Sequence, residues 1–401
     1  MVGRKKAHVR SGNRNRSRSP ARSKQASKSS TRGGRQQSRT TTAATSQEAV
    51  QSNDQVSPLQ DTAHQQKLLG IFQGTFDAVL SSGNFNTILQ EVKTALFKRE
   101  FDIAFGKEEF LEAYAARWSP TRTLCYASVL HGIGSHLEEL WRRADDHDDD
   151  DQKSDSVPFM RVLAIGGAAA ELVAFGSYLS QQPAEIAGAI TLVDIAPWSG
   201  VVEKLRVGLK TPPPLSKYAS AALQAANTPI NEPERLKEIA FQQQDVFALD
   251  QDGLAALVSA DPGGQRDPIL VTLLFTLNEL FTSVGIGKTT TFLLTLTSKL
   301  PIGSLLLVID SPGSYSETTV GKEAKRYPMA WLLDKILTGA SDVEDDSEKW
   351  EKVESKDSVW FRLGGELRYP IPLEDMRYQM HLYRKGAGRG NGEGHEDGDD
   401  E

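Results

Sequence analysis

The sequence predicts an α/β protein in which a helical region precedes a sheet of seven strands, mostly parallel, with an antiparallel last pair. Three observations predict this class. Over residues 158–385, short β-rich runs alternate with helical ones, which is typical of a parallel sheet flanked by helices. The last two β-rich runs lie close together with turn residues between them, which suits an antiparallel pair. Before residue 144, apolar residues recur only at helical spacing.

The first 60 residues are expected to form a disordered basic tail, because they are Ser, Arg, Gln, Thr and Gly with almost no large apolar side chain. Residues 1–40 contain 13 Lys or Arg and no Asp or Glu; since the whole chain has a net charge of −7, the remainder carries −20. A flexible cationic arm attracts nucleic-acid phosphates without sequence preference, and it also fits nuclear import. A solvated tail without a partner is the alternative.

Residues 61–144 are predicted to form a helical domain. Its apolar residues recur at spacings of three and four, as in Leu68, Phe72 and Phe76. The pattern predicts helices at residues 68–80, 88–97 and 108–117, and a fourth from residue 119. Ser119 would be the N-cap of the fourth helix, with Pro120 at its first helical position. The Asp-rich residues 145–157 then read as a solvated acidic linker.

Seven strands are expected in the domain that follows, over residues 158–385. They are residues 161–165, 189–193, 239–244, 269–275, 304–309, 358–363 and 377–384. Seven strands that end in an antiparallel pair describe one particular nucleotide-binding sheet. Residues 342–356 are interpreted as a charged surface insertion, and residues 386–401 as a disordered, Gly-rich acidic tail.

Composition excludes several classes of protein. The single cysteine, Cys125, rules out an internal disulfide framework and a cysteine-built zinc site, which favours a reducing compartment. The seven histidines are scattered, so no metal site is predicted. No membrane span is expected, since the richest apolar stretch, residues 269–286, contains Asn278 and Glu279. A secretory signal is not expected either.

Candidate binding residues follow three predicted strands. Gly166 and Gly167 end the first strand, where small residues let a ligand approach the backbone and leave the next helix N-terminus open to an anionic or polar group. Asp194 ends the second strand and is placed to accept hydrogen bonds from two ribose hydroxyls. Asp245 and Val246 follow the third, where an acid beside an apolar residue suits an adenine. A plain tight turn and two helix caps are the alternative interpretations.

With these residues in place, the sequence resembles the class I S-adenosylmethionine-dependent methyltransferases. Over residues 64–385 it resembles, more narrowly, the fungal 25S ribosomal RNA uridine-N3 methyltransferase family. The narrower resemblance rests on five segments: Arg117-Trp118-Ser119-Pro120, Gly166-Gly167 with Glu171-Leu172-Val173-Ala174, and residues 273–280, 310–317 and 376–384.

The resemblance implies a Rossmann-like methyltransferase sheet that binds S-adenosyl-L-methionine. It implies that Gly166 and Gly167 face the methionine part of the cofactor, Asp194 the ribose and Asp245 the adenine; Glu171 and Val246 are counted with the same site. It further implies ribosomal RNA or a pre-ribosome as the partner. A nuclear or nucleolar location is expected, with the cytoplasm as a further location.

The sequence departs from the superfamily pattern in the loop after the first strand. The acid usual two residues before the first glycine is Ala164, and alanines at 168 and 170 replace the later glycines. Because alanine does not freely adopt positive φ, we expect either a differently shaped loop or a weaker affinity for the cofactor.

Candidate catalytic residues lie after the fourth and fifth predicted strands. Methyl transfer to uracil N3 requires loss of the N3 proton, and we expect Glu279 or Asp310 to be the base, with Asn278 on the uracil edge. For Asp310, a turn-forming role before a proline is the alternative. Tyr315 is a candidate for stacking on a base. His381 in the last strand reads as a hydrogen-bonded sheet residue rather than a base.

Two other functions compete with methyl transfer. Residues 285–290, Gly-Ile-Gly-Lys-Thr-Thr, and residues 310–313 resemble parts of a GTPase. However, a phosphate loop needs a glycine where Thr282 stands and should follow a strand, so Lys288 is predicted to be a surface helix residue. The third possibility, motivated by the alanines of the loop, is a degenerate fold that acts as a ribosome-assembly scaffold.

Overall fold

The computed structural model describes most of the chain beyond the N-terminal tail. The described residues are 55–56, 60–141, 158–231, 235–258, 267–313, 315–320, 323–339 and 349–386. The predicted basic tail up to residue 54, the predicted linker at 145–157 and the predicted acidic tail from residue 387 lie outside these ranges.

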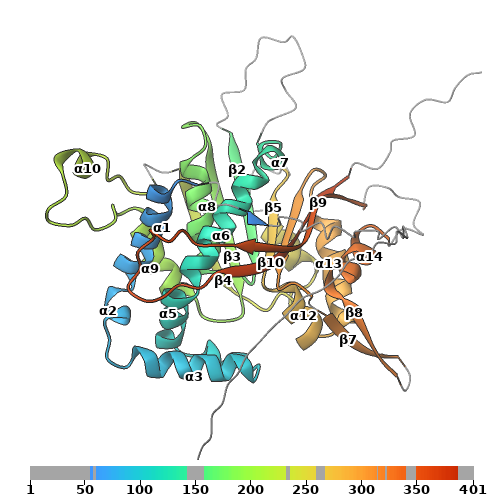
Figure 1. Cartoon of the computed structure of the whole chain (residues 1–401). Coiled ribbons are helices and arrows are strands. Elements are labelled where there is room, and N and C mark those ends of the chain that lie inside the picture. Colours follow the sequence, from blue (N-terminus) through green and yellow to red (C-terminus); the bar gives the residue numbers. More distant parts are fainter. Residues whose placement is uncertain are drawn as a thin grey trace, which may run out of the picture. The chain divides into compact units, whose positions relative to one another are not determined.

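Eight strands form one mixed sheet in the order β1-β9-β10-β6-β5-β2-β3-β4 (Figure 1). Strands β2 to β6 pair in parallel, whereas β10 is antiparallel to both β6 and β9. The bounds are β1 Gln55–Val56, β2 Phe159–Ile165, β3 Ala187–Asp194, β4 Leu236–Gln243, β5 Leu270–Leu274, β6 Leu305–Asp310, β9 Trp350–Phe361 and β10 Met376–Lys385. The predicted seven-stranded Rossmann-like sheet with an antiparallel last pair is confirmed. The two-residue β1, parallel to β9, is an addition that no pattern in the sequence predicted.

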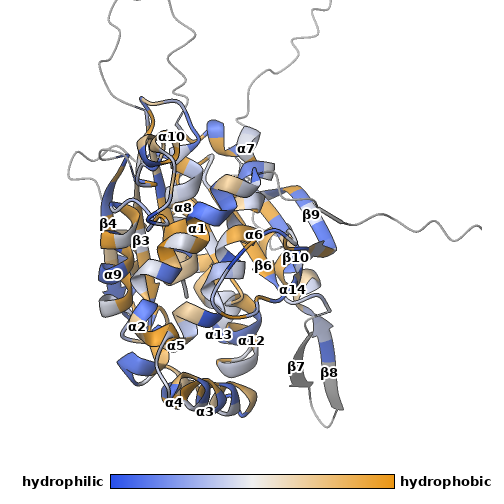
Figure 2. Ribbon diagram, turned by 60° about the vertical axis from the view of Figure 1, so that its left-hand side comes forward, coloured by the Kyte–Doolittle hydropathy of each residue, from blue (hydrophilic) through white to orange (hydrophobic). Residues whose placement is uncertain are grey.

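The central strands are continuous apolar runs because helices cover both of their faces. Every residue of β5 and β6 is buried. Along β6 the side chains alternate between two cores: Leu305, Leu307 and Ile309 face one, and Leu306 and Val308 face the other. Figure 2 shows the resulting hydrophobic colouring of β3 and β6.

Two sets of helices form the outer layers. The first set, on one face, consists of the helices of the helical region and three later helices. Those of the helical region are α1 Thr62–Thr75, α2 Asp77–Leu80, α3 Phe85–Phe97, α4 Phe101–Ala104, α5 Glu108–Arg117, α6 Ser119–Gly132 and α7 Gly134–Glu138. The later ones are α8 Ala169–Ser180, α9 Ser199–Leu209 and the outlying α10 Ala221–Ala225. On the other are α11 Gln251–Val258, α12 Leu277–Ser283, α13 Ile286–Lys299 and α14 Met329–Leu337. The helical region therefore shares a continuous apolar core with one face of the sheet. Its separation from the sheet as a domain stays a proposal.

Two local predictions are wrong. Residues 350–356, expected in a surface insertion, belong to β9, whose Trp350 is buried and donates its indole N–H to Thr297 Oγ1 at 3.0 Å. The charged, mostly exposed residues after Trp350 hid this first part of β9, which pairs with β10 but not with β1, from the sequence pattern. Helix α6 starts at Ser119 itself, with Trp118 as the N-cap, and Ser119 makes no capping hydrogen bond. The hairpin of β7 Tyr315–Val320 and β8 Glu323–Pro328 was not predicted.

No helix in the described part of the chain combines the length and the apolar character that a membrane crossing requires. Within the same residues, His, Cys, Asp and Glu do not gather into a group of three or more suited to a metal ion.

Candidate functional site

The turn between β2 and α8 requires glycine at two consecutive positions. Gly166 adopts φ +68, and its N–H donates to the carbonyl of Val193 at 2.8 Å. A Cβ atom at Gly166 would lie 2.4 Å from Oγ1 of Thr276, and one at Gly167 would lie 2.8 Å from Cβ of Ala164. The backbone of this turn thus contacts the end of β5 across the point where the strand order reverses, the usual ligand crevice of such sheets.

The two alanines that replace glycines do not need the left-handed backbone that favours glycine. Ala168 is the N-cap of α8 with φ −148, and Ala170 lies inside the helix, so neither position needs a positive φ. In this loop the left-handed backbone conformation is therefore confined to one residue, Gly166.

The Glu171 carboxyl lies beside Ala164, the residue that stands where an acid was expected. Its Oε2 accepts a hydrogen bond from the Ala168 N–H at 3.0 Å. A Cβ atom at Gly167 would touch both Ala164 and the Cγ and Cδ atoms of Glu171, so these two side chains flank the same glycine. Burial raises the pKa of Glu171, against the backbone hydrogen bonds and the charge of Arg122, which lower it. The small Ala164 leaves room for a carboxyl supplied from α8.

Two backbone hydrogen bonds tie the tips of β2, β3 and β4 together at the same edge of the sheet. One is the Gly166 bond to Val193, and the other joins the Gln244 N–H to the carbonyl of Asp194 at 2.9 Å. The Asp194 carboxylate accepts the Ala196 N–H at 2.7 Å. Burial raises the pKa of Asp194 to about 6, although hydrogen bonds oppose the shift.

The residues after β4 differ in exposure. Asp245 is exposed, and its Oδ1 accepts the N–H of Phe247 at 2.9 Å, which forms a local turn. Val246 is buried in the core that β5 and α11 share. The structure therefore places Asp194 and Asp245 on neighbouring strand tips, with Val246 beneath the surface. The exposed Ile195, which the sequence analysis did not single out, follows Asp194.

The three candidate catalytic residues lie together at the ends of β5 and β6 but in different surroundings. Asp310 is buried, and its two oxygens accept the backbone N–H groups of Asn278 at 3.0 Å and Ser311 at 2.8 Å. Burial is the largest influence on its pKa, which rises to about 6. Glu279 forms an ion pair of 2.6 Å with Arg99, and both side chains are partly exposed. The side-chain oxygen of Asn278 is buried and has no hydrogen-bond partner among the described residues.

Arg122 on α6 is a residue that the sequence analysis missed. Its Nη1 donates to the Tyr114 hydroxyl at 2.6 Å, and its guanidinium lies 4.9 Å from the ring centroid of Phe275 at the end of β5. Phe275 has φ +58, which is rare for a bulky side chain and typical of functional sites. No described carboxylate comes within the 4.0 Å of an ion pair with Arg122. An arginine within a helix whose other residues are nearly all buried was the available signal.

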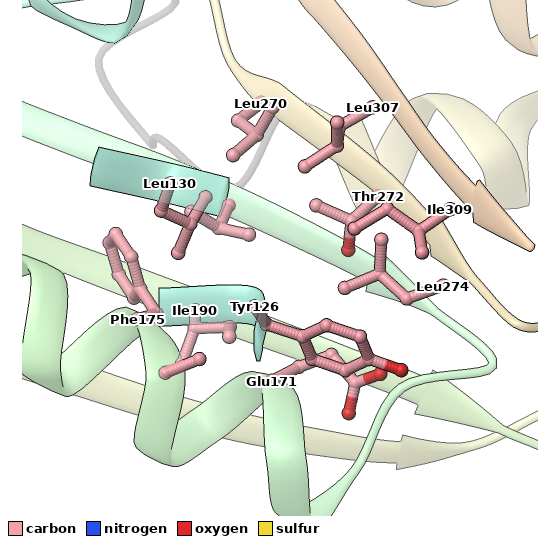
Figure 3. A pocket seen from close by; sticks show the side chains of 12 residues that line it. Tyr126, Leu130, Glu171, Phe175, Ile190, Leu270, Thr272, Leu274, Leu307 and Ile309 are labelled. Carbon is pink, nitrogen blue, oxygen red and sulfur yellow. The ribbon is translucent and has the colours of Figure 1, made fainter. Parts of the chain in front are cut away.

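A small cavity lies between α6, α8 and the sheet (Figure 3). Its volume is about 20 Å³, and its lining is apolar except for Tyr126, Glu171 and Thr272. The hydroxyls of Tyr126 and Thr272 are buried without a hydrogen-bond partner in the described part of the chain. The space has the size of one water molecule, so a nucleoside must bind elsewhere, and the strand tips are the natural place.

The segment that resembles a phosphate loop has the wrong surroundings. Helix α12 runs up to it, and Gly285, with φ +98, is the N-cap of α13. No strand leads into the segment, and Lys288 is exposed on the helix as predicted. His381 is hydrogen-bonded within the sheet, to Ser355 Oγ at 2.8 Å and to Gln379 Oε1 at 3.1 Å. The side chain of Tyr315 lies outside the described residues.

Comparison with known proteins gives a family match over most of the chain. The family described as "Putative SAM-dependent methyltransferase" matches residues 72–384. The 25S rRNA (uridine(2843)-N(3))-methyltransferase of Saccharomyces cerevisiae is 33% identical over 316 residues, which are 74% of this chain and 77% of the yeast protein.

Two solved structures illustrate a distant similarity. An O-methyltransferase family protein from Burkholderia thailandensis is 12% identical, with 77% of this chain and 74% of that chain covered and a TM-score of 0.30. The N-methyltransferase NodS from Bradyrhizobium japonicum, in complex with S-adenosyl-L-homocysteine, is 11% identical, with 56% and 78% covered and a TM-score of 0.26. At these TM-scores the similarities carry no argument.

Proposed function

The chain belongs to this family of SAM-dependent methyltransferases, and we propose that it methylates N3 of a uridine in large-subunit ribosomal RNA. The observation that carries the proposal is the 33% identity over 316 residues to a yeast enzyme whose name states this reaction. The family match over residues 72–384 includes the helical region as well as the sheet, so the similarity extends to the surfaces beside the strand tips.

The residues at the strand tips fit the proposed binding of S-adenosylmethionine. When bound, this cofactor supplies an electrophilic methyl group on a sulfonium. Gly166 and Gly167 would lie against its methionine part, because they form the turn at the tip of β2, beside the point where the strand order reverses. Glu171 would take the role of the acid that is usual at position 164, and its carboxylate would face the cofactor's ammonium group. This relocation would remove the expectation of weak affinity.

Asp194 and Asp245 would hold the nucleoside end of the cofactor. The partly buried Asp194 is suited to accept hydrogen bonds from two ribose hydroxyls. The exposed Asp245, on the tip of the next strand, is suited to bind the amino edge of an adenine. The exposed Ile195 would contact a face of the adenine. Val246 would support this surface from the core.

The target uridine would lie at the ends of β5 and β6, beside Asn278, Glu279 and Asp310. We assign the uracil edge to Asn278, since its buried amide oxygen has no partner within the described chain. Either acid is a candidate for the base that takes the N3 proton. Asp310, with a pKa of about 6, is the better matched to neutral pH, whereas the ion pair with Arg99 occupies Glu279.

A nuclear or nucleolar location follows from the proposed substrate. Ribosomal RNA precursors are made there, and the Lys- and Arg-rich residues 1–40 suit both nuclear import and contact with RNA phosphates. The cytoplasm is the alternative, for an enzyme that acts on finished subunits.

Mass spectrometry of ribosomal RNA nucleosides from cells with and without the gene tests the proposal. Loss of one 3-methyluridine from large-subunit RNA is expected, and an unchanged set of methylated nucleosides would contradict it. Calorimetry with S-adenosylhomocysteine separates the other functions: a GTPase would bind GTP with magnesium instead, and a scaffold would bind neither.

A further inference from the structure

Arg122 places a positive charge at the end of β5, where it interacts electrostatically with Glu171 and Asp310 but is paired with neither. The guanidinium lies over the Phe275 ring at 4.9 Å, and one of its N–H groups is held by the Tyr114 hydroxyl at 2.6 Å. Among the described residues no acid forms an ion pair with it. The ring and the hydroxyl fix the guanidinium at the end of β5, and within the described part of the chain its remaining N–H donors have no hydrogen-bond acceptor.

The proposed reaction creates negative charge at this place. The N3–H bond of uracil breaks and its proton goes to a base or to water. The N3 electron pair then forms the bond to the methyl carbon, while the carbon–sulfur bond breaks and its electrons stay on sulfur. Before transfer, the deprotonated ring spreads one negative charge over N3 and its two flanking carbonyl oxygens. A planar fork of N–H donors matches an oxygen of this anion.

Neither candidate base is well placed to drive this ionisation alone. The Asp310 oxygens are both bound by backbone N–H groups, and Glu279 is paired with Arg99. Resting on the proposed uridine-N3 activity, we propose that Arg122 is a catalytic residue that donates hydrogen bonds to the uracil imide anion and stabilises it. The anion then forms near neutral pH with only a weak base, because the cation lowers the energy of the charged form.

Several titratable groups surround Arg122 and must be separated from its effect. They are Tyr114 on α5, Tyr126 on α6, Glu171 on α8 and Asp310 at the end of β6. Burial raises the pKa of Glu171 and of Asp310, and the charge of Arg122 lowers both. Burial also raises the pKa of Tyr126. Because acids and a phenol both lie near Arg122, a pH profile of the rate does not identify the ionising group by itself, and the second test follows the ionisation of the uracil imide directly.

The first test compares the pH dependence of methylation by wild type, Arg122→Gln and Arg122→Lys. The Gln variant should lose about 10²–10³-fold in kcat at pH 7, as when one donor to a developing anion is removed, and should recover part of this rate as pH rises. The Lys variant should lose less and keep the wild-type profile. Arg206→Gln, which removes an exposed cation on α9, is the control for net charge and should keep the wild-type rate. A loss equal at every pH would overturn the proposal.

The second test measures the ionisation directly, without turnover. The RNA that the wild type methylates is resynthesised with 5-fluorouridine at the target, and the ¹⁹F shift is followed against pH in the complex with S-adenosylhomocysteine. Bound to wild type, the imide should ionise roughly one to three pH units lower than in free RNA, the shift typical of a group beside an opposite charge. The Gln variant should lose most of this shift and still bind S-adenosylhomocysteine within about threefold of wild type.

The outcomes distinguish this inference from the function on which it rests. If the wild type forms no 3-methyluridine, the proposed function fails. If it forms 3-methyluridine but does not lower the pH at which the fluorinated base ionises, only the role of Arg122 fails. A Gln variant that loses cofactor affinity and keeps the ¹⁹F shift would likewise overturn that role and place Arg122 on the cofactor.

Discussion

Asp194 combines two properties that a ribose-binding carboxylate needs. It is held in place by the Ala196 N–H, and burial keeps its pKa at about 6, so it is ionised at neutral pH but only just. An acid this poorly solvated gains from any ligand hydroxyl that donates to it, because the burial cost is already present in the free protein.

Asp194→Ala should therefore weaken the binding of S-adenosylhomocysteine by about 1–3 kcal/mol, the cost of leaving buried hydroxyls without an acceptor. Isothermal titration calorimetry measures it directly. Asp102→Ala, which removes an exposed acid from α4, is the matched control and should leave the affinity unchanged. Wild-type affinity in Asp194→Ala would show that the ribose is bound elsewhere.

Asp310 makes the stability of the fold depend on pH. Its pKa rises from the ordinary 3.8 to about 6 because burial disfavours the carboxylate, despite the two backbone N–H donors. The folded protein thus binds this proton more tightly than the unfolded chain. The group's contribution to stability is fully present below pH 4 and is lost as pH rises through about 6, a total of about 3 kcal/mol.

Urea unfolding of wild type and Asp310→Asn between pH 4 and pH 7 tests this sign. The difference in unfolding free energy between them should decrease by up to about 3 kcal/mol as pH rises, because only the wild type has the titrating group. The corresponding difference for Asp102→Asn should stay flat. A difference that grows with pH would mean that the carboxylate, rather than the acid, is the stabilised form.

At the scale of elements, the contact between the β2–α8 turn and the β5–α12 turn is the tightest part of the site. Gly166 combines positive φ with a space that Thr276 closes, whereas Gly313 has a similar φ of +69 and nothing within 4 Å of a Cβ atom. A comparison of alanine substitutions at these two glycines therefore distinguishes the cost of backbone strain from the cost of a steric contact.

Gly166→Ala should accordingly destabilise the protein more than Gly313→Ala does. The Gly313 variant carries only the strain of the left-handed backbone, about 1 kcal/mol, and the Gly166 variant adds a contact of 2.4 Å with Thr276 Oγ1. Thermal or urea unfolding measures both. Thr276→Gly in the Gly166→Ala background should recover the steric part alone. Equal losses for the two single variants would remove the contact between the turns from the explanation.

The central elements could be predicted from sequence because their burial leaves a continuous pattern. Strands β5 and β6 are apolar at nearly every position, and the Gly166-Gly167 turn and Asp194 follow strands of this kind. The start of β9 carries an exposed, charged face, which gives the same composition as a surface loop. Edge strands give this weaker signal because one side of the ladder faces water.

The part of the site that sequence reasoning missed depends on contacts between distant segments. Arg122 is a single cation in a helix, and nothing in its local spacing shows that it lies over Phe275, which is about 150 residues away in the chain. The assignment of Glu171 beside Ala164 likewise needed the path of the loop, since six residues separate them in the chain. Charged residues that serve a site are placed by tertiary structure, so their local patterns resemble those of surface residues.

At the scale of the whole molecule, charge is divided sharply along the chain. Residues 1–40 carry +13, and the remaining residues sum to −20. The described folded residues carry a net charge of only −3, and most of the remaining negative charge lies in residues 145–157, 340–348 and 387–401. A nearly neutral fold offers RNA little long-range attraction, so this attraction must come chiefly from the basic segment and from local cations such as Arg122.

Deleting residues 1–40 should therefore weaken RNA binding and flatten its dependence on salt, because fewer counterions are released from the RNA. The logarithm of the association constant should fall less steeply with the logarithm of salt concentration, by about 0.7 for each phosphate of single-stranded RNA that the shortened protein no longer neutralises. S-adenosylhomocysteine affinity should be unchanged, since the proposed cofactor residues all lie in the sheet domain. Replacing the 13 basic residues of the same segment by Gln is the matched control for length, and it should reproduce the deletion. A salt slope equal to that of the full chain would assign RNA attraction to the folded part despite its negative charge.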